Sequence, residues 1–254
     1  MIETALVFVP ALAAAALVAA THVPLGREVL RAGIVFLDLA IAQAAGFGVI
    51  LIGVRFDVGS GAPLLQVGAA AAALMAAAVL AWTEARVGVL QEAVIGSAFV
   101  LAASAALLAL SSNPHAGEHL QDLLVGQVLW TTWSALLPVA ILYGLVLGRW
   151  WWRRGRLSRF EFYALFALTV TASVQLVGVY LVFATLILPA IAAHGLAGRI
   201  GTWVAYGTAV AGYFAGFLVA ISADLPAGPV VVFALAGVAL VARLARRQGT
   251  ARSS

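Results

Sequence analysis

The chain has 254 residues, of which 64% are hydrophobic and only 9% are charged. A soluble globular domain carries about 25% charged residues, so the composition excludes an ordinary water-soluble fold and predicts that lipid surrounds most of the chain. The net charge of +4 would suggest nucleic acid as the partner of a soluble protein. In a membrane protein, topology explains such a charge, and we expect no nucleic-acid partner.

Apolar runs long enough to cross the hydrocarbon layer as helices, about 20 residues each, follow one another along the chain. The first run, 5–20, comes after an acidic N-terminus, so we expect a retained span and not a cleaved signal peptide. The predicted spans cover residues 3–21, 33–54, 63–82, 92–110, 125–148, 161–177, 179–197, 201–221 and 227–243.

The stretch 161–197 decides the number of spans. As one helix it would be about 55 Å long, nearly twice the ~30 Å of the membrane core, so we expect the chain to reverse at Val177-Gly178. This gives about nine spans, and a continuous helix would give eight. The sequence therefore predicts an all-α, polytopic transmembrane bundle in a bacterial-type inner membrane, with residues 1–246 as one membrane domain and 247–254 as a cytoplasmic tail.

The arginines orient this layout. All fourteen basic residues are arginine, and with nine spans only Arg55 falls on one side of the membrane. By the positive-inside rule, the N-terminus is predicted outside and the C-terminus in the cytoplasm. The arginines on the predicted cytoplasmic side are Arg27, Arg31, Arg86, Arg149, Arg153, Arg154, Arg156, Arg159, Arg199, Arg243, Arg246, Arg247 and Arg252.

Small residues are concentrated in three predicted spans. The second span is rich in glycine and alanine, the third is nearly all alanine, and the eighth contains Gly212-x-x-x-Gly216. Such residues let helix backbones approach closely in lipid. The alternative is that alanine and glycine are simply abundant in this chain.

Ionisable groups inside spans are candidates for function because lipid makes them costly. Asp38 lies about five residues into the second span, where it serves either a transport path or a structural hydrogen bond. Glu92 opens the fourth span, and His194 closes the seventh as an interfacial histidine. Asp224 precedes Leu-Pro at the outer end of the eighth span, which favours a turn or the N-cap of the next helix.

One predicted outer loop, 111–122, contains two histidines. If a helix follows Asn113-Pro114, His115 and His119 share a face and Asp122 lies one turn further on, a spacing that could hold a zinc-type ion. The alternative is an ordinary polar loop.

Signatures of enzymes are missing from the sequence. It has no HExxH and no GxSxG, and without lysine it cannot form a Walker A site. It has no cysteine for a disulfide, a thiolate metal site or a nucleophile. We therefore expect no catalysis and no ATP hydrolysis by this chain.

Four stretches of the chain carry, in this order, a resemblance to a known family: 25–48, 92–96 with 123–130, 177–190 and 222–229. Through these stretches the chain resembles the permease subunits of metal-ion ABC transporters, which import zinc, manganese or iron. The resemblance implies alternating access, a homodimeric or pseudo-dimeric pore, a cytoplasmic ATP-binding subunit that carries the ATP, and an extracytoplasmic solute-binding protein. It would place Asp38, Gln43, Pro189 and Asp224 along the path, although Pro189 could equally be an ordinary kink.

The second span departs from the family pattern, which has Asp and His at i and i+4. Leu39 and Gln43 stand at those two positions, and Asp38 is shifted by one residue, about 100° around the helix. The usual metal pair is therefore absent. Gln43 still offers an amide oxygen, which holds a soft divalent ion less firmly than imidazole does.

The cytoplasmic loop 149–160 is the other departure, because it is shorter and more basic than the family's ATPase-docking segment. Its arginines, Arg153, Arg154, Arg156 and Arg159, either anchor the topology beside interfacial tryptophans or contact the ATPase. These departures keep two alternatives open: an ATP-independent carrier or channel, and a non-transporting scaffold or sensor.

Overall fold

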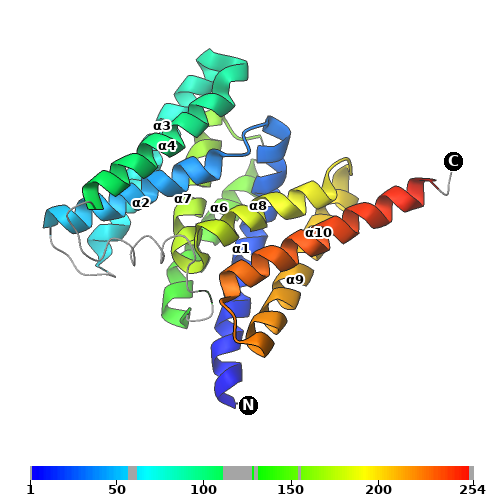
Figure 1. Ribbon diagram of the computed structural model, residues 1–254. Helices are drawn as coiled ribbons and strands as arrows, with labels where there is room; N and C mark the ends of the chain where they lie inside the picture. Colours follow the sequence, from blue (N-terminus) through cyan, green and yellow to red (C-terminus); the bar gives the residue numbers. More distant parts are fainter. Residues whose placement is uncertain (1, 57–61, 111–127, 129–130, 154–155, 252–254) are drawn as a thin grey trace. The chain divides into compact units, whose positions relative to one another are not determined.

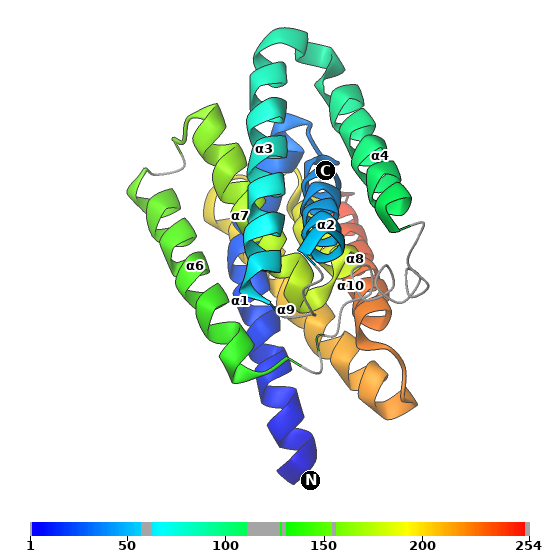
Figure 2. The same ribbon diagram turned by 90° about the vertical axis from the view of Figure 1, so that its left-hand side faces the viewer.

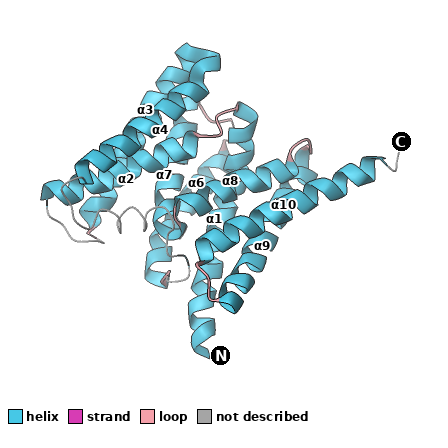
Figure 3. Ribbon diagram, in the orientation of Figure 1, coloured by secondary structure: helices cyan, strands magenta, loops and turns pink. Residues whose placement is uncertain are grey.

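The computed structural model describes residues 2–56, 62–110, 128, 131–153 and 156–251. All regular structure in these ranges is helical (Figure 3), which confirms the predicted fold class. The helices are α1 (Ile2–Ala32), α2 (Leu37–Phe56), α3 (Pro63–Val87), η1 (Gly88–Leu90), α4 (Gln91–Leu110), α6 (Trp133–Trp152), α7 (Arg159–Val177), α8 (Val179–Ala193), α9 (Gly198–Ala223) and α10 (Ala227–Ala251).

Within the described ranges, seven helices are long and apolar enough to cross a membrane: α1, α2, α3, α6, α7, α9 and α10. Two more apolar helices are shorter, over Gln91–Ala106 in α4 and Val179–Ala193 in α8. Many large apolar side chains point away from the rest of the chain, among them Met75, Leu101 and Phe233, as expected where lipid replaces water. A polytopic helical membrane protein is therefore confirmed, and the count of nine crossings stays a prediction.

Several predicted span boundaries are wrong. The fifth span was expected to begin at residue 125, but helix α6 begins at Trp133 because Thr132 precedes it as a cap, with its Oγ1 accepting the Ala135 N–H at 3.4 Å. The first span was expected to end at residue 21, but α1 continues to Ala32. Thr21 does not interrupt α1, since its hydroxyl donates to the Val18 carbonyl at 3.2 Å.

An interruption of the helix at the predicted position, Val177-Gly178, is confirmed, and the reversal of the chain there stays a prediction. Helix α7 ends at Val177, α8 begins at Val179, and Gly178 between them has φ +79° and ψ 160°. That combination lies in a region open essentially to glycine alone. Helix α8 then ends at Ala193, four residues earlier than the predicted end at residue 197.

The helices are distributed over two compact units, which are described separately. The first comprises Met1–Ala32, Val125–Ile141 and Leu176–Ser254, and it contains α1, α8, α9 and α10. The second comprises Gly33–Leu124 and Leu142–Gln175, and it contains α2, α3, α4 and most of α7. Helix α6 is divided between the two units.

In the first unit, α9 and α10 lie side by side as a hairpin (Figures 1 and 2). The Gly212-x-x-x-Gly216 motif faces α10, since a Cβ on Gly212 would lie 2.5 Å from Leu235 Cδ2 and one on Gly216 would lie 2.6 Å from Val231 Cα. The expectation that this motif serves close helix packing is thereby confirmed.

In the second unit, α2 packs against both α3 and α4 (Figure 2). Gly48 of α2 meets the backbone of Gly68 and the side chain of Ala72 on α3. Buried alanines recur every four residues on α3, at Ala69, Ala73 and Ala77. This spacing aligns them on one helical face, and their small side chains allow the two backbones to approach.

Candidate functional site

Asp38 is the charged residue buried most deeply in the described part of the chain. It lies in the first turn of α2 and is 1% exposed. Neither of its carboxyl oxygens has the geometry of a hydrogen bond with a described residue. Among the described residues, the positive end of the α2 dipole and the nearby backbone N–H groups of Asp38 and Leu39 can stabilise a negative charge. A buried carboxyl without a partner is costly unless it binds a cation or a proton.

A second carboxyl lies in the same unit, at the start of α4. Glu92 occupies the first turn, as predicted, and its Oε1 accepts the Phe36 N–H at 3.2 Å. Its Oε2 is buried and has no hydrogen-bond partner among the described residues. Because Phe36 is two residues before Asp38, the starts of α2 and α4 each bring a carboxyl group to this part of the unit. The sequence singled out Glu92 but assigned it no role.

Gln43 does not share a face with Asp38. Residues five apart are separated by about 140° around a regular α-helix, and α2 is continuous from Leu37 to Phe56. The buried face that contains Asp38 continues through Ala42 and Ala45, whereas Gln43 is half-buried. The arrangement offers no Asp and amide pair on one face.

Pro189 lies buried in α8, in the first unit. It removes one backbone N–H from the helix, which leaves the Thr185 carbonyl without its usual partner. The Thr185 side chain donates to the Leu181 carbonyl at 2.7 Å and lies 2.8 Å from the Tyr213 hydroxyl of α9. The region around Pro189 therefore places polar groups inside the first unit.

Asp224 is exposed and caps the C-terminus of α9. Its backbone is left-handed, with φ 53° and ψ 46°, and the N–H groups of Asp224 and Leu225 both bond to the Ala220 carbonyl. Aspartate is among the few residues that tolerate this conformation, which ends helices. The expected turn is correct, but the expected N-cap of the next helix is wrong, since α10 begins only at Ala227.

Arginines of the basic loop are paired largely within the chain. Arg149 bonds to Glu161 at 2.5 Å, Arg153 lies 3.6 Å from the same carboxylate, and Arg159 lies 3.1 Å from Glu84 at the end of α3. Arg156 is exposed, and Arg154 lies outside the described residues. The loop is thus joined to α3 and α7 of its own unit.

The predicted metal group of His115, His119 and Asp122 lies outside the described residues. Across the ranges that are described, no three His, Asp or Glu side chains come together in a way that could hold a metal ion. His194 is exposed at the C-cap of α8, where the sequence expected an interfacial residue.

Sequence reasoning missed His22, a fully buried residue of α1. Its Nδ1 lies 2.9 Å from the Val18 carbonyl, so Nδ1 carries the proton and Nε2 is left without a described partner. The predicted first span ended one residue earlier, at residue 21, so His22 fell outside it. Only a longer predicted first span would have placed His22 inside the membrane.

Comparisons with known proteins agree on the family and the fold. The profile of the ABC 3 transport family matches residues 5–158 and 154–246. Among solved structures, the chain is similar to PsaBC from Streptococcus pneumoniae, solved in complex with Fab, with TM-score 0.73 and 18% identity over 93% of this chain and 90% of that one.

An inward-facing structure of a metal-chelate type ABC transporter is also similar, with TM-score 0.59 and 14% identity over 94% of this chain and 77% of that one. A search of curated protein sequences gave no match. At these identities the structures show the fold alone, whereas the family profile covers nearly the whole chain. The resemblance inferred from the sequence is confirmed: the chain belongs to the ABC 3 transport family.

Proposed function

We propose that the chain is the membrane-spanning permease subunit of an ABC importer that moves a divalent metal ion or a metal chelate by alternating access. The family match supports a transport subunit, and one solved structure of the same fold is of the metal-chelate type. The observation that carries the metal assignment is Asp38, a buried carboxyl in a membrane span that has no hydrogen-bond partner among the described residues. Such a group is stabilised when a cation passes.

The proposal includes the partners that such a subunit requires. A separate cytoplasmic subunit binds and hydrolyses ATP, an extracytoplasmic solute-binding protein delivers the cargo, and two copies of the permease form the pore. The inner membrane is the location, with the N-terminus outside and the C-terminus in the cytoplasm. Asp38, Gln43, Pro189 and Asp224 belong to the path, and His115, His119 and Asp122 form a capture site at its outer end.

One observation favours an ATP-independent carrier or channel as a second candidate. The basic loop is short, and Arg153 and Arg159 pair with carboxylates of the same chain. Among the described arginines of 153–159, this leaves Arg156 as the exposed one that is not paired with a carboxylate. A scaffold or sensor subunit is the third candidate, because the second span has no Asp and His pair.

Transport by the reconstituted protein separates these candidates. Proteoliposomes that contain the permease, with and without its ATP-binding subunit, are supplied with Mn, Zn, Fe or Co and the solute-binding protein. We expect uptake of at least one metal that requires both the ATPase and ATP. Uptake that is indifferent to ATP would establish the carrier, and no uptake of any metal by a folded complex would leave the scaffold.

In the same assay, Asp38→Asn tests the carboxyl. The amide has the same shape as the carboxylate but no charge, so insertion into the membrane should be unchanged. Uptake should fall by about tenfold or more, because the metal ion loses one charged contact. Glu28→Gln is the control, because Glu28 is half-buried and pairs with Arg31 in the described structure. Normal uptake by Asp38→Asn would assign Asp38 a packing role.

A further inference from the structure

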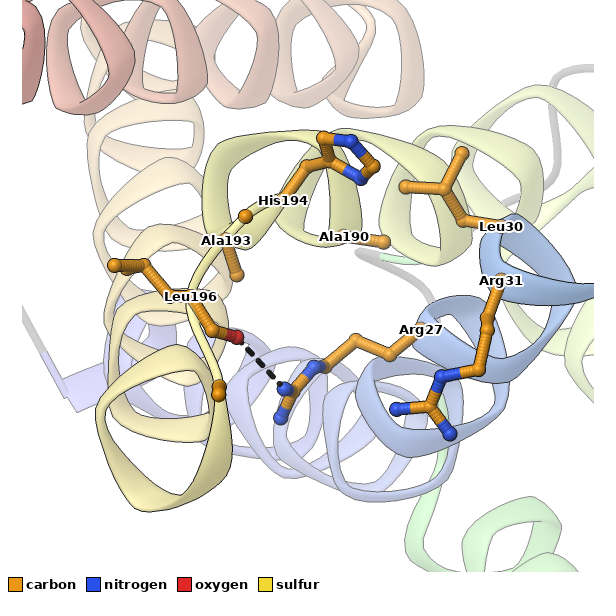
Figure 4. A pocket seen from close by; sticks show the side chains of 9 residues that line it. Arg27, Leu30, Arg31, Ala190, Ala193, His194 and Leu196 are labelled. Atoms are coloured by element: carbon orange, nitrogen blue, oxygen red, sulfur yellow. Dashed lines mark hydrogen bonds between the residues drawn. The ribbon is translucent and has the colours of Figure 1, made fainter.

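A cavity of about 280 Å³ opens where three helix ends of the first unit meet. It lies between the last turns of α1, the end of α8 and the turn that leads into α9 (Figure 4). Arg27, Arg31 and His194 supply its basic groups, and Leu30, Leu196 and Ala197 are among its apolar lining. None of these residues has a role in the proposed transport path.

Among the described residues, the positive charge in this cavity is neutralised only in part. The Arg27 guanidinium is half-buried and donates to the Thr202 hydroxyl at 2.5 Å and to the Leu196 carbonyl at 3.4 Å, both neutral groups. Arg31 pairs with Glu28 at 2.9 Å, but its side chain is 71% exposed, so that pair is weak. No carboxylate is among the lining residues.

The backbone adds to this positive potential. Ala197 is the N-cap of α9, and no side chain caps the first turn of that helix, which leaves its N–H groups and the positive end of its dipole open. The carbonyl groups at the C-terminal end of α8 would add negative potential, but two of them already accept hydrogen bonds from arginines. Arg243 donates to the Ile191 carbonyl at 2.9 Å, and Arg246 donates to the Ala192 carbonyl. The cavity therefore favours an anion.

The surroundings of the cavity are those of a membrane surface. The apolar stretch of α1 ends at Ala32, one residue after Arg31. On α9, Ile200 is 67% and Trp203 is 74% exposed, within six residues of Ala197, and exposed tryptophan is typical of the headgroup level. A ligand with an anionic head and an apolar body would satisfy both the arginines and the leucines of the lining.

We propose that this cavity binds a phosphate group, held by the guanidinium groups of Arg27 and Arg31 and by the open first turn of α9. Arginine suits phosphate because its planar fork donates two parallel hydrogen bonds. Basic pockets between membrane helices commonly bind phosphate headgroups. The apolar part of the lining favours an anionic lipid as the source of the phosphate over a soluble phosphate ion.

Native mass spectrometry of the delipidated full chain tests this proposal. The protein is titrated with phosphatidylglycerol, with phosphatidylcholine of the same acyl chains, and with inorganic phosphate. We expect phosphatidylglycerol to bind more tightly than phosphatidylcholine, and each of Arg27→Gln and Arg31→Gln to weaken it by roughly fivefold, the contribution of one basic residue close to lipid headgroups.

Ala197→Asp provides a variant that does not threaten folding. Aspartate is a favoured N-cap, so α9 should be at least as stable, while the added carboxylate occupies the open turn and should abolish the preference for phosphatidylglycerol. Arg86→Gln is the matched control. Arg86 also ends a span, but its guanidinium donates to the Trp82 carbonyl at 2.9 Å and stacks on the Trp82 ring, and Arg86 is not among the residues that line the cavity.

The outcomes separate the sources and the alternatives. If the cavity variants weaken the binding of inorganic phosphate as much as that of phosphatidylglycerol, and the lipid binds no more tightly than phosphate, the cavity is a phosphate site whose ligand is a soluble phosphate and not a lipid. Equal weakening by Arg86→Gln would show that only total charge matters, and the site would be rejected. Unchanged lipid binding in all three cavity variants would also reject the phosphate site. If these variants bind lipid normally but no longer bind a cytoplasmic protein partner, the cavity is a protein-docking site instead.

Discussion

At Gly26 the backbones of α1 and α8 meet directly. A Cβ on this glycine would overlap the carbonyl oxygen of Leu186, a backbone atom that cannot turn aside as a side chain can. The glycine belongs to the last third of α1, beyond the predicted end of the first span. Its role therefore became visible only when the helix was seen to continue to Ala32.

Replacing Gly26 by alanine should separate α1 from α8. The overlap forces a backbone shift, so we expect a loss of about 1–3 kcal/mol of stability, the usual range for an overpacked site, seen as a lower unfolding temperature in detergent. Gly144→Ala on α6 is the control, since a Cβ there meets nothing within 4 Å. Equal unfolding temperatures of the two variants would contradict the close contact.

Individual polar residues show where prediction from sequence ends. The sequence could identify Asp38 as an ionisable group in a span, because hydropathy alone marks it. It could not predict that neither carboxyl oxygen has a partner in the described part of the chain, because this depends on the groups that the neighbouring helices present. The pair of Arg159 with Glu84 joins residues far apart in the chain, and a single sequence contains no signal for it.

At the scale of helices, the apolar centres of the spans were predictable and their ends were not. Runs of about 20 apolar residues have few alternatives in lipid, so each predicted centre falls on a helix. The ends depend on single hydrogen bonds, such as the Thr132 cap of α6 and the bond of Thr21 inside α1. A turn at Asp224 was predicted. The alternative role of Asp224 as the N-cap of the next helix was wrong, because its left-handed backbone makes it the C-cap of α9.

The break between α7 and α8 rests on one glycine, and this can be tested. Gly178→Ala places a Cβ in a backbone region that alanine avoids, so it should cost about 1–3 kcal/mol and lower the yield of folded protein. Gly207→Ala, inside α9 and free of close neighbours, should have little effect. If Gly178→Ala unfolds at the temperature of the parent chain, alanine adopts the break without strain, or α7 and α8 rejoin as one helix.

For the whole molecule, the decisive question is how often the chain crosses the membrane. Helix α8 has 15 residues, about 22 Å at 1.5 Å per residue, which is shorter than the ~30 Å membrane core. The nine-span layout needs α7 and α8 to cross separately. An eight-span layout would place everything after α8 on the opposite side.

Single cysteines distinguish the two layouts, because the chain has none of its own. With nine spans, Leu225→Cys, in the exposed turn between α9 and α10, should react with a membrane-impermeant maleimide in intact cells. Ser158→Cys, in the exposed loop before α7, should react only after permeabilisation and serves as the reference for the inner side. Both layouts place Ser158 inside, but only the nine-span layout places Leu225 outside. If Leu225→Cys is protected until permeabilisation while Ser158→Cys behaves as expected, α7 and α8 together cross the membrane once, and the predicted cytoplasmic C-terminus is reversed.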